Sequence, residues 1–203
     1  MIKELIILGS TGSIGKSTLN VIRKNKTKFK IKLLSTNNNI NKIYSQAIEF
    51  KVKNVLIANK NNNQKFKNNF KRKNINVYFN INDALKKYKK KVFCSINAIS
   101  GIEGLEPTLQ IIKYSKNIAL ANKESIICGW SFISKELKKN NTNFIPLDSE
   151  HFSIWSMLKN ENLQNVKKIY LTASGGPFLN KNLSQIYNIK AKYALKHPNW
   201  AMG

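Results

Sequence analysis

Short runs of β-branched and aliphatic residues alternate with helical patterns along most of the chain. The first such pair is the strand LIIL with the helix KSTLNVIRK, and the last is NIALAN with ESIICGWSFISKELKK. Apolar residues in the second pair recur at the spacing of one helix face: Ile40, Ile43, Tyr44, Ala47 and Ile48. Strands that are each followed by a helix build a parallel sheet. The sequence therefore predicts an α/β, Rossmann-like sheet with helices on both faces over residues 1–143.

The pattern changes after Asn143. A helix with Trp and Met, HFSIWSMLKN, is followed by the strand-like KKIYLTASG, the turn GGPF and finally KHPNW. Polar and unusual residues gather at the ends of these segments. We expect a domain boundary near Asn143 and the beginning of a second, α+β domain over residues 144–203, unfinished at Gly203.

Glycines follow the first predicted strand, and they fit two phosphate-binding devices. Gly9, Gly12 and Gly15 form a G-x-x-G-x-x-G turn between strand and helix, a relative of the dinucleotide fingerprint. Gly15-Lys16-Ser17 also matches the end of a Walker A loop, but the first glycine of that loop would have to stand where Ser10 does. The dinucleotide interpretation is the better match, and a P-loop nucleotide hydrolase is the alternative.

The end of the second predicted strand bears on which dinucleotide is bound. An NAD site usually places an acidic residue there, on the ribose hydroxyl. This chain has Ser-Thr-Asn-Asn-Asn over 35–39, without a carboxylate. Neutral donors favour NADP, although the arginine that often accompanies it is also absent.

Asp148 and Glu150 stand out because the chain has only 10 acidic residues and two of them lie in one tripeptide. In an extended segment, positions i and i+2 point to the same side. Two carboxylates aimed at one point suit a hard cation such as Mg²⁺ or Mn²⁺. The alternative is a strand end whose Asp148 or Ser149 caps the following helix.

Further polar residues stand at predicted strand ends and turns. Lys123 and Glu124 open a helix, where they could bind a substrate phosphate and orient the nicotinamide, or only cap the first turn. Ser174 precedes two glycines in a turn suited to anion binding, and His197 lies near Trp200 in a segment that could cover a substrate. A bare turn and a structural histidine are the alternatives.

Composition and charge limit which partners and which compartment we expect for this protein. The formal net charge is +25, yet the lysines are spread along the chain among Asn and Ile, as A/T-rich codons would produce, so we expect no specific nucleic-acid partner. Cys94 and Cys128 are expected to be small buried residues in a reducing compartment. We find no signal peptide and no apolar run of the roughly 18 residues that a membrane span requires, which predicts a cytoplasmic protein without a membrane partner.

The segments GSTGSIG, LANKES, PLDSEH, SGGPF and HPNW, in this order, resemble one family closely, 1-deoxy-D-xylulose 5-phosphate reductoisomerase. The resemblance runs from Ile2 to Gly203 and covers the amino-terminal half of a family member. It implies an NADPH-dependent oxidoreductase that converts 1-deoxy-D-xylulose 5-phosphate to 2-C-methyl-D-erythritol 4-phosphate in non-mevalonate isoprenoid biosynthesis. It also implies a homodimer when the protein is full length.

The resemblance assigns roles to positions of this chain. Implied NADPH contacts are Thr11, Gly12, Ser13, Ile14, Asn37, Asn39, Asn122, Glu124 and Gly203. Implied substrate contacts are Lys123, Ser149, Glu150, Ser174 and His197. The implied metal ligands are Asp148 and Glu150, for Mg²⁺ or Mn²⁺, and the implied catalytic residues are Lys123, Glu150, His197 and Trp200. Where the family has Gly-Lys-Asn near the 2′-phosphate, this chain has Asn37-Asn38-Asn39, so only Asn39 matches.

The family pattern continues beyond HPNW with a third metal carboxylate and further substrate contacts. We therefore expect this chain to be either a fragment or a form that keeps nucleotide binding without turnover. Two carboxylates leave a hard cation short of ligands, which predicts weak metal binding by these residues alone.

Overall fold

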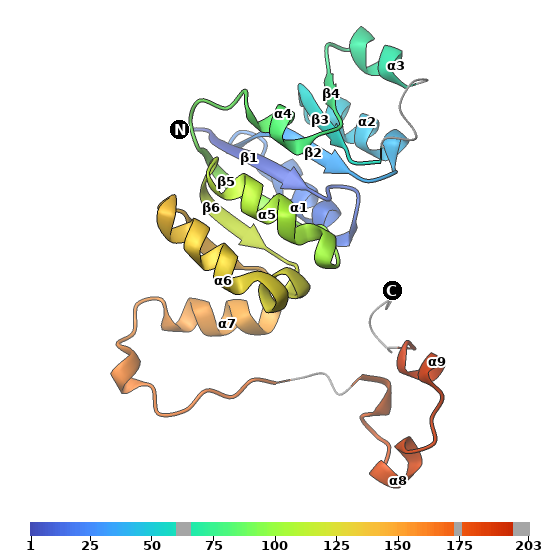
Figure 1. Cartoon of the computed structure of the whole chain (residues 1–203), viewed down its shortest axis with the longest axis vertical. Helices are drawn as coiled ribbons and strands as arrows, with labels where there is room; N and C mark the ends of the chain where they lie inside the picture. Colours follow the sequence, from blue (N-terminus) through green and yellow to red (C-terminus); the bar gives the residue numbers. More distant parts are fainter. Residues whose placement is uncertain (60–65, 173–175, 197–203) are drawn as a thin grey trace. The chain divides into compact units, whose positions relative to one another are not determined.

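A computed structural model describes residues 1–59, 66–172 and 176–196 of the chain. It divides into two compact units, Met1–Trp155 and Ser156–Gly203 (Figure 1). We describe each unit by itself.

The first unit is built on a seven-stranded sheet in which all neighbouring strands are parallel. The strand order is β4-β3-β2-β1-β5-β6-β7. The strands are β1 Lys3–Leu8, β2 Phe29–Thr36, β3 Asn54–Ile57, β4 Asn76–Tyr78, β5 Val92–Asn97, β6 Ser115–Leu120 and β7 Asn143–Pro146. The predicted α/β, Rossmann-like fold is confirmed.

Helices cover both faces of this sheet. The helices of this unit are α1 Ser13–Lys24, α2 Ile40–Glu49, α3 Lys67–Arg72, α4 Ile81–Leu85, α5 Leu105–Ile112 and α6 Lys123–Lys139, with a 3-10 turn η2 Ile102–Gly104 before α5; α7 Ser149–Leu158 begins in the unit. Figure 1 shows α5 in front of the sheet and α1 behind it.

The sheet separates two hydrophobic cores, because successive side chains of a strand point to opposite faces. In β1, Leu5 and Ile7 join the core under α1 and α2, whereas Ile6 and Leu8 join the core under α5 and α6. All four side chains are buried. Burial on both faces explains why β1 is a continuous apolar run rather than an alternating one.

The helical pattern of the second pair is also realised. In α2, Ile40, Ile43 and Ala47 are buried and Tyr44 packs against the same core. Ile48, at the edge of this stripe, is 41% exposed. The prediction is therefore wrong for Ile48, and the buried face extends to Gln46 instead.

Two of the glycines in the first turn are required by close packing. Gly9 has a φ of 74°, and a Cβ there would lie 2.6 Å from the carbonyl oxygen of Ala98. A Cβ on Gly15 would lie 2.3 Å from the carbonyl oxygen of Gly9. At Gly12, by contrast, the same atom would meet only the Gly9 oxygen, at 3.5 Å. Gly9 and Gly15 therefore serve the fold, while Gly12 faces open space.

Cysteine burial differs from the expectation at one position. Cys94 on β5 is buried, and burial raises the pKa of its thiol to about 11. Cys128 on α6 is exposed, so the expectation of burial is wrong there. The buried positions of α6 are Ser125, Gly129, Ile133 and Leu137, a four-residue repeat that leaves Cys128 off the packed face.

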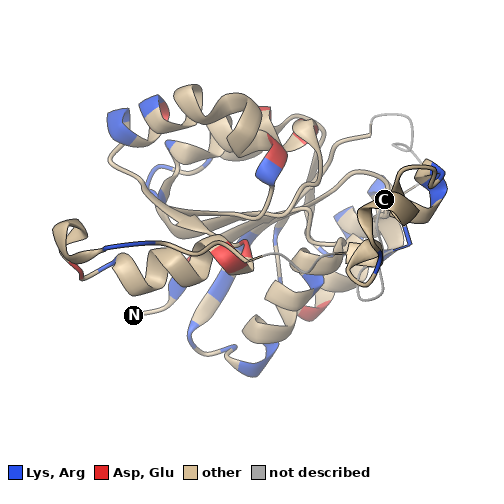
Figure 2. Ribbon diagram, turned by 90° about the horizontal axis from the view of Figure 1, so that it is seen from below, with Lys and Arg blue, Asp and Glu red and all other residues tan. Residues whose placement is uncertain are grey.

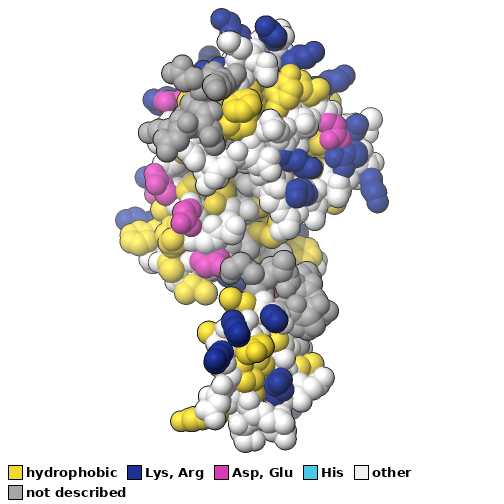
Figure 3. Space-filling model, turned by 90° about the vertical axis from the view of Figure 1, so that its right-hand side faces the viewer, with side chains coloured by type: hydrophobic (Ala, Val, Ile, Leu, Met, Phe, Trp, Pro, Cys, Tyr) yellow, Lys and Arg dark blue, Asp and Glu magenta, His cyan; other side chains and the backbone are white. Residues whose placement is uncertain are grey.

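The second unit contains η3 Leu163–Asn165, η4 Gly176–Phe178, α8 Leu183–Ile186 and α9 Ala191–Ala194. None of its described residues is buried, and leucines and tyrosines stand among lysines on its surface, as the lower part of Figure 3 shows. Of the predicted strand KKIYLTASG, the described residues 167–172 are not in a strand, because no neighbouring strand pairs with them.

Positive charge is distributed widely. Figure 2 shows Lys and Arg on segments throughout the ribbon. Within the described ranges, none of the helices is long and apolar enough to cross a membrane.

The close contact between Gly15 and the Gly9 backbone predicts that Gly15→Ala destabilises the first unit. Crowding against backbone atoms should lower the free energy of unfolding by about 2 kcal/mol, more than the helix propensity of Ala restores. Urea unfolding followed by circular dichroism measures this. Gly12→Ser is the matched control, expected to change stability by less than about 0.5 kcal/mol because its side chain has room and Ser caps helices well. Equal stability of Gly15→Ala and the native chain would contradict the packing argument.

Candidate functional site

A cleft of about 690 Å³ opens at the carboxyl ends of the central strands. We call it the carboxyl-edge cleft. It is lined by Leu8, Gly9, Thr11, Gly12, Ser35, Thr36, Asn37, Leu56, Ala58, Phe79, Asn80, Ile81, Asn82, Ala98, Ile99, Ser100, Glu103, Glu106, Pro107 and Gln110. Chain order reverses between β1 and β5, so the connections after these strands leave in opposite directions and open the crevice in which such sheets bind ligands.

Hydrogen bonds fix the glycine turn to the end of β2. The Gly9 N–H donates to Ser35 Oγ at 2.9 Å, and the hydroxyls of Thr11 and Thr36 are 2.8 Å apart. Ser10 Oγ donates to Gln46 Oε1 of α2 at 2.8 Å, in a buried position. The turn is thus held rigidly before any ligand arrives.

The start of α1 is available to an anion. The helix begins at Ser13 after Gly12, which provides no side-chain cap, and its first turn contains no acidic residue. The uncapped N–H groups and the helix dipole both favour a negative group at this end. Ser13 and Ile14 are exposed there, and Thr11 and Gly12 line the cleft.

The three asparagines predicted to contact NADPH lie in different surroundings. Asn37 lines the cleft, whereas Asn39 caps α2, its side chain accepting from the Lys42 N–H at 3.2 Å. Asn122 is buried: it caps α6 by accepting from the Ser125 N–H at 2.7 Å, and it donates to the carbonyls of Ile99 and Gly101. Its side chain ties the end of β6 to the loop beside the cleft.

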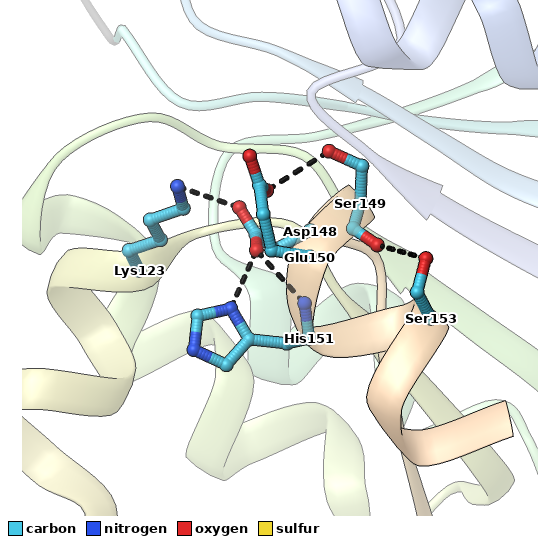
Figure 4. Close-up of polar contacts among 6 residues, drawn as sticks. All are labelled: Lys123, Asp148, Ser149, Glu150, His151 and Ser153. Carbon is cyan, nitrogen blue, oxygen red and sulfur yellow. Dashed lines mark hydrogen bonds and ion pairs between the residues drawn. The ribbon is translucent and has the colours of Figure 1, made fainter. Parts of the chain in front are cut away.

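A second polar group forms where β6 and β7 end. The Asp148 carboxylate lies 2.6 Å from Lys123 Nζ and 2.5 Å from His151 Nδ1 (Figure 4). It also accepts from the His151 backbone N–H at 3.2 Å, so Asp148 caps the start of α7. We call Lys123, Asp148, Glu150 and His151 the carboxylate cluster.

The local geometry differs from the extended tripeptide that we expected. The helix α7 starts at Ser149, so Glu150 lies in its first turn and not on a strand. The two carboxylates nevertheless lie next to each other in Figure 4, and Ser149 Oγ donates to Glu150 Oε2 at 2.9 Å. The capping alternative for Asp148 is the one realised, and it is compatible with the pairing of carboxylates.

Electrostatics keep Asp148 ionised. Partial burial raises the pKa of its carboxyl, but hydrogen bonds from Lys123 and His151 outweigh burial and hold the pKa well below its usual range. The hydrogen bond to Asp148 in turn raises the pKa of Lys123. The cluster therefore presents an anionic oxygen donor and a cation side by side near neutral pH.

His151 was missed by sequence reasoning, which considered His197 instead. The available signal is the spacing Asp148 to His151 across a helix start, since residues i and i+3 meet there. His151 and Asp148 also line an apolar hollow of about 480 Å³ together with Trp130 and Trp155. The predicted residues Ser174, His197, Trp200 and Gly203 lie outside the described residues.

Metal-ligand chemistry is only partly provided here. Carboxylate oxygens suit Mg²⁺ or Mn²⁺, and the cluster supplies two carboxylates, those of Asp148 and Glu150. Among the residues that the structure describes, no group of three or more His, Cys, Asp and Glu side chains is placed to hold a metal.

Comparison with known proteins gives consistent results. The family model of 1-deoxy-D-xylulose 5-phosphate reductoisomerase matches residues 5–129, and the model of the C-terminal domain of that enzyme matches residues 144–203. The reductoisomerases of Pelagibacter ubique and Clostridium kluyveri are 51% and 38% identical to this chain, each over 99% of it. The alignments cover 52% and 53% of those proteins, so the chain spans about half the length of these relatives.

Solved structures of reductoisomerases resemble this chain over nearly its full length. The reductoisomerase from Zymomonas mobilis in complex with NADPH has a TM-score of 0.84 and 29% identity, covering 98% of this chain and 52% of its own. A DOX-P reductoisomerase in complex with NADPH, fosmidomycin and magnesium has a TM-score of 0.80 and 30% identity, covering 100% of this chain and 52% of its own. These matches give no support to the P-loop alternative.

The contacts of Asp148 predict an acid-sensitive contribution to stability. A carboxyl whose folded pKa is depressed stabilises the fold above its ordinary pKa of about 3.9, and the contribution is lost as pH falls through the folded value. We expect Asp148→Asn to lower the free energy of unfolding at pH 7 by about 1 kcal/mol, since both partners are more than half exposed.

The difference between Asp148→Asn and the native chain should shrink below about pH 4. Urea unfolding in EDTA at pH 7, 5 and 3 measures it. Asp83→Asn is the control, because Asp83 and its partner Lys86 are both well exposed. A difference that stays constant across this pH range would contradict the assignment.

Proposed function

We propose, because this chain belongs to the 1-deoxy-D-xylulose 5-phosphate reductoisomerase family, that it forms the NADPH-binding part and the beginning of the catalytic part of such an enzyme. The complete protein would convert 1-deoxy-D-xylulose 5-phosphate to 2-C-methyl-D-erythritol 4-phosphate in isoprenoid biosynthesis. We place the cofactor domain in residues 1–143 and the start of the catalytic domain in 144–203. We further propose a homodimer at full length, located in the cytoplasm, without a specific nucleic-acid partner.

The observation that carries this proposal is the carboxyl-edge cleft with its rigid glycine turn. The uncapped start of α1 offers backbone N–H groups to a pyrophosphate, and Gly12 leaves room for its approach. Thr11, Ser13 and Ile14 would complete this contact. Asn37 and Asn39 would lie at the adenosine end of NADPH, and Asn122, Glu124 and Gly203 towards its nicotinamide end.

The carboxylate cluster would hold the reacting groups. Asp148 and Glu150 fit a divalent cation by the chemistry of their oxygens, and a bound Mg²⁺ or Mn²⁺ would stabilise negative charge on the substrate oxygens. Lys123, which keeps Asp148 ionised, would contact the phosphorylated sugar together with Ser149 and Glu150. Ser174, His197 and Trp200 would complete the substrate contacts and cover them.

Nucleotide preference is the direct test of this function. Titration of the 203-residue chain with NADPH, NADH and ATP, followed by Trp fluorescence, should give an affinity for NADPH about tenfold higher than for the other two, or about 1.4 kcal/mol. Lys16→Ala is the control, because Lys16 is exposed on α1 and essential only to a P-loop enzyme. Tightest binding of ATP, together with its loss in Lys16→Ala, would overturn the proposal.

Metal affinity tests the carboxylate cluster. With two carboxylates, the chain should bind Mn²⁺ weakly, with a Kd above about 0.1 mM by calorimetry. Glu150→Gln should weaken binding further, whereas Glu161→Gln, at an exposed position, should not. A micromolar Mn²⁺ site, or one insensitive to Glu150→Gln, would show that the ligands are wrongly assigned.

A further inference from the structure

The carboxyl-edge cleft has a shortage of positive charge for the ligand proposed above. Its described lining contains no Lys or Arg, but it does contain Glu103 and Glu106. NADPH differs from NADH by a 2′-phosphate, a dianion that proteins usually meet with a cation. The end of β2, where that phosphate would lie, carries only neutral asparagines over 37–39.

Two of these asparagines are already engaged within the fold. Asn38 Oδ1 accepts from Asn59 Nδ2 at 2.6 Å, and the side chain of Asn39 caps α2. Neutral amides fixed in this way add no charge at the end of β2. A cation on a neighbouring element would supply the charge that these amides lack.

Lys67, the first residue of α3, is such a cation. Its Nζ lies 5.0 Å from the centre of the Phe79 ring, and Phe79 forms part of the wall of the cleft. The attraction of an ammonium to an aromatic face holds it there. Among the described residues, no carboxylate pairs with Lys67, so its charge is available to a ligand.

Lys67 and the start of α2 border the same small cavity. Lys67, Phe79 and Ile40 all line a space of about 10 Å³. Ile40 is the first residue of α2 and directly follows Asn39. Lys67 and the first residue of α2 thus border the same small space, beside a helix start whose dipole favours an anion.

We propose that Lys67, steered by Phe79, binds the 2′-phosphate of NADPH and selects it over NADH. This inference rests on the proposed function, since it takes the carboxyl-edge cleft to be the dinucleotide site. It identifies a charged contact that Asn37, Asn38 and Asn39 do not provide.

The test is the ratio of the Kd values for NADH and NADPH, measured on the 203-residue chain by Trp fluorescence. Lys67→Gln should raise the Kd for NADPH about tenfold and leave that for NADH within about twofold. Lys67→Arg should keep the native ratio, because it keeps the charge. Lys71→Gln, an exposed lysine one turn further along α3, is the matched control and should also keep it.

The outcomes separate the two proposals. A native chain that binds neither nucleotide would overturn the proposed function and this inference together. A native chain that prefers NADPH, with the same preference in Lys67→Gln, would overturn the inference alone. Equal weakening of NADPH and NADH in Lys67→Gln would also overturn it, because the lysine would then not act on the 2′-phosphate. The ratio does not depend on the fraction of protein that is folded, so a partly unfolded variant still gives an answer.

Discussion

The arrangement of the first unit depends on the lack of space around Gly9. The peptide that leaves β1 passes so close to Ala98 and to Gly15 that a side chain on either glycine would collide with backbone. This contact fixes where α1 begins and how its first N–H groups face the carboxyl-edge cleft. A larger residue would move the helix away from the sheet, and the cleft and the uncapped start of α1 would change together.

Both polar regions of the first unit lie at the same edge of the sheet, but they are built differently. The glycine turn is held by buried hydroxyl contacts and presents neutral donors. The carboxylate cluster is more exposed and depends on charge, with Asp148 shared between a lysine and a histidine. One region is thus held by buried hydrogen bonds between neutral groups, whereas the other is held by charge at a more exposed position.

The fold could be predicted because it rests on local patterns: the apolar run of β1 and the stripe Ile40, Ile43 and Ala47 are each contained in a few residues. The candidate site was harder to predict from the sequence, because its contacts join distant segments or depend on where a helix starts. The role of Asp148 as a cap moved Glu150 from a strand to a helical turn and brought in His151. Residues 167–172 show what a local sequence pattern cannot predict. Their side chains favour a strand, but no neighbouring strand pairs with them, so no strand forms.

The position of β1 in the sheet also affects how the chain is made. β1 precedes the other strands of this sheet along the chain, yet it pairs with β5 as well as β2, through Leu5 to Cys94 and Leu8 to Asn97. One of its edges must therefore wait until β5, Val92–Asn97, has been synthesised. An apolar strand with an open edge is prone to pair with other chains. The nascent protein thus passes through a stage in which this central apolar strand has an open edge, and protection by a chaperone would matter most there.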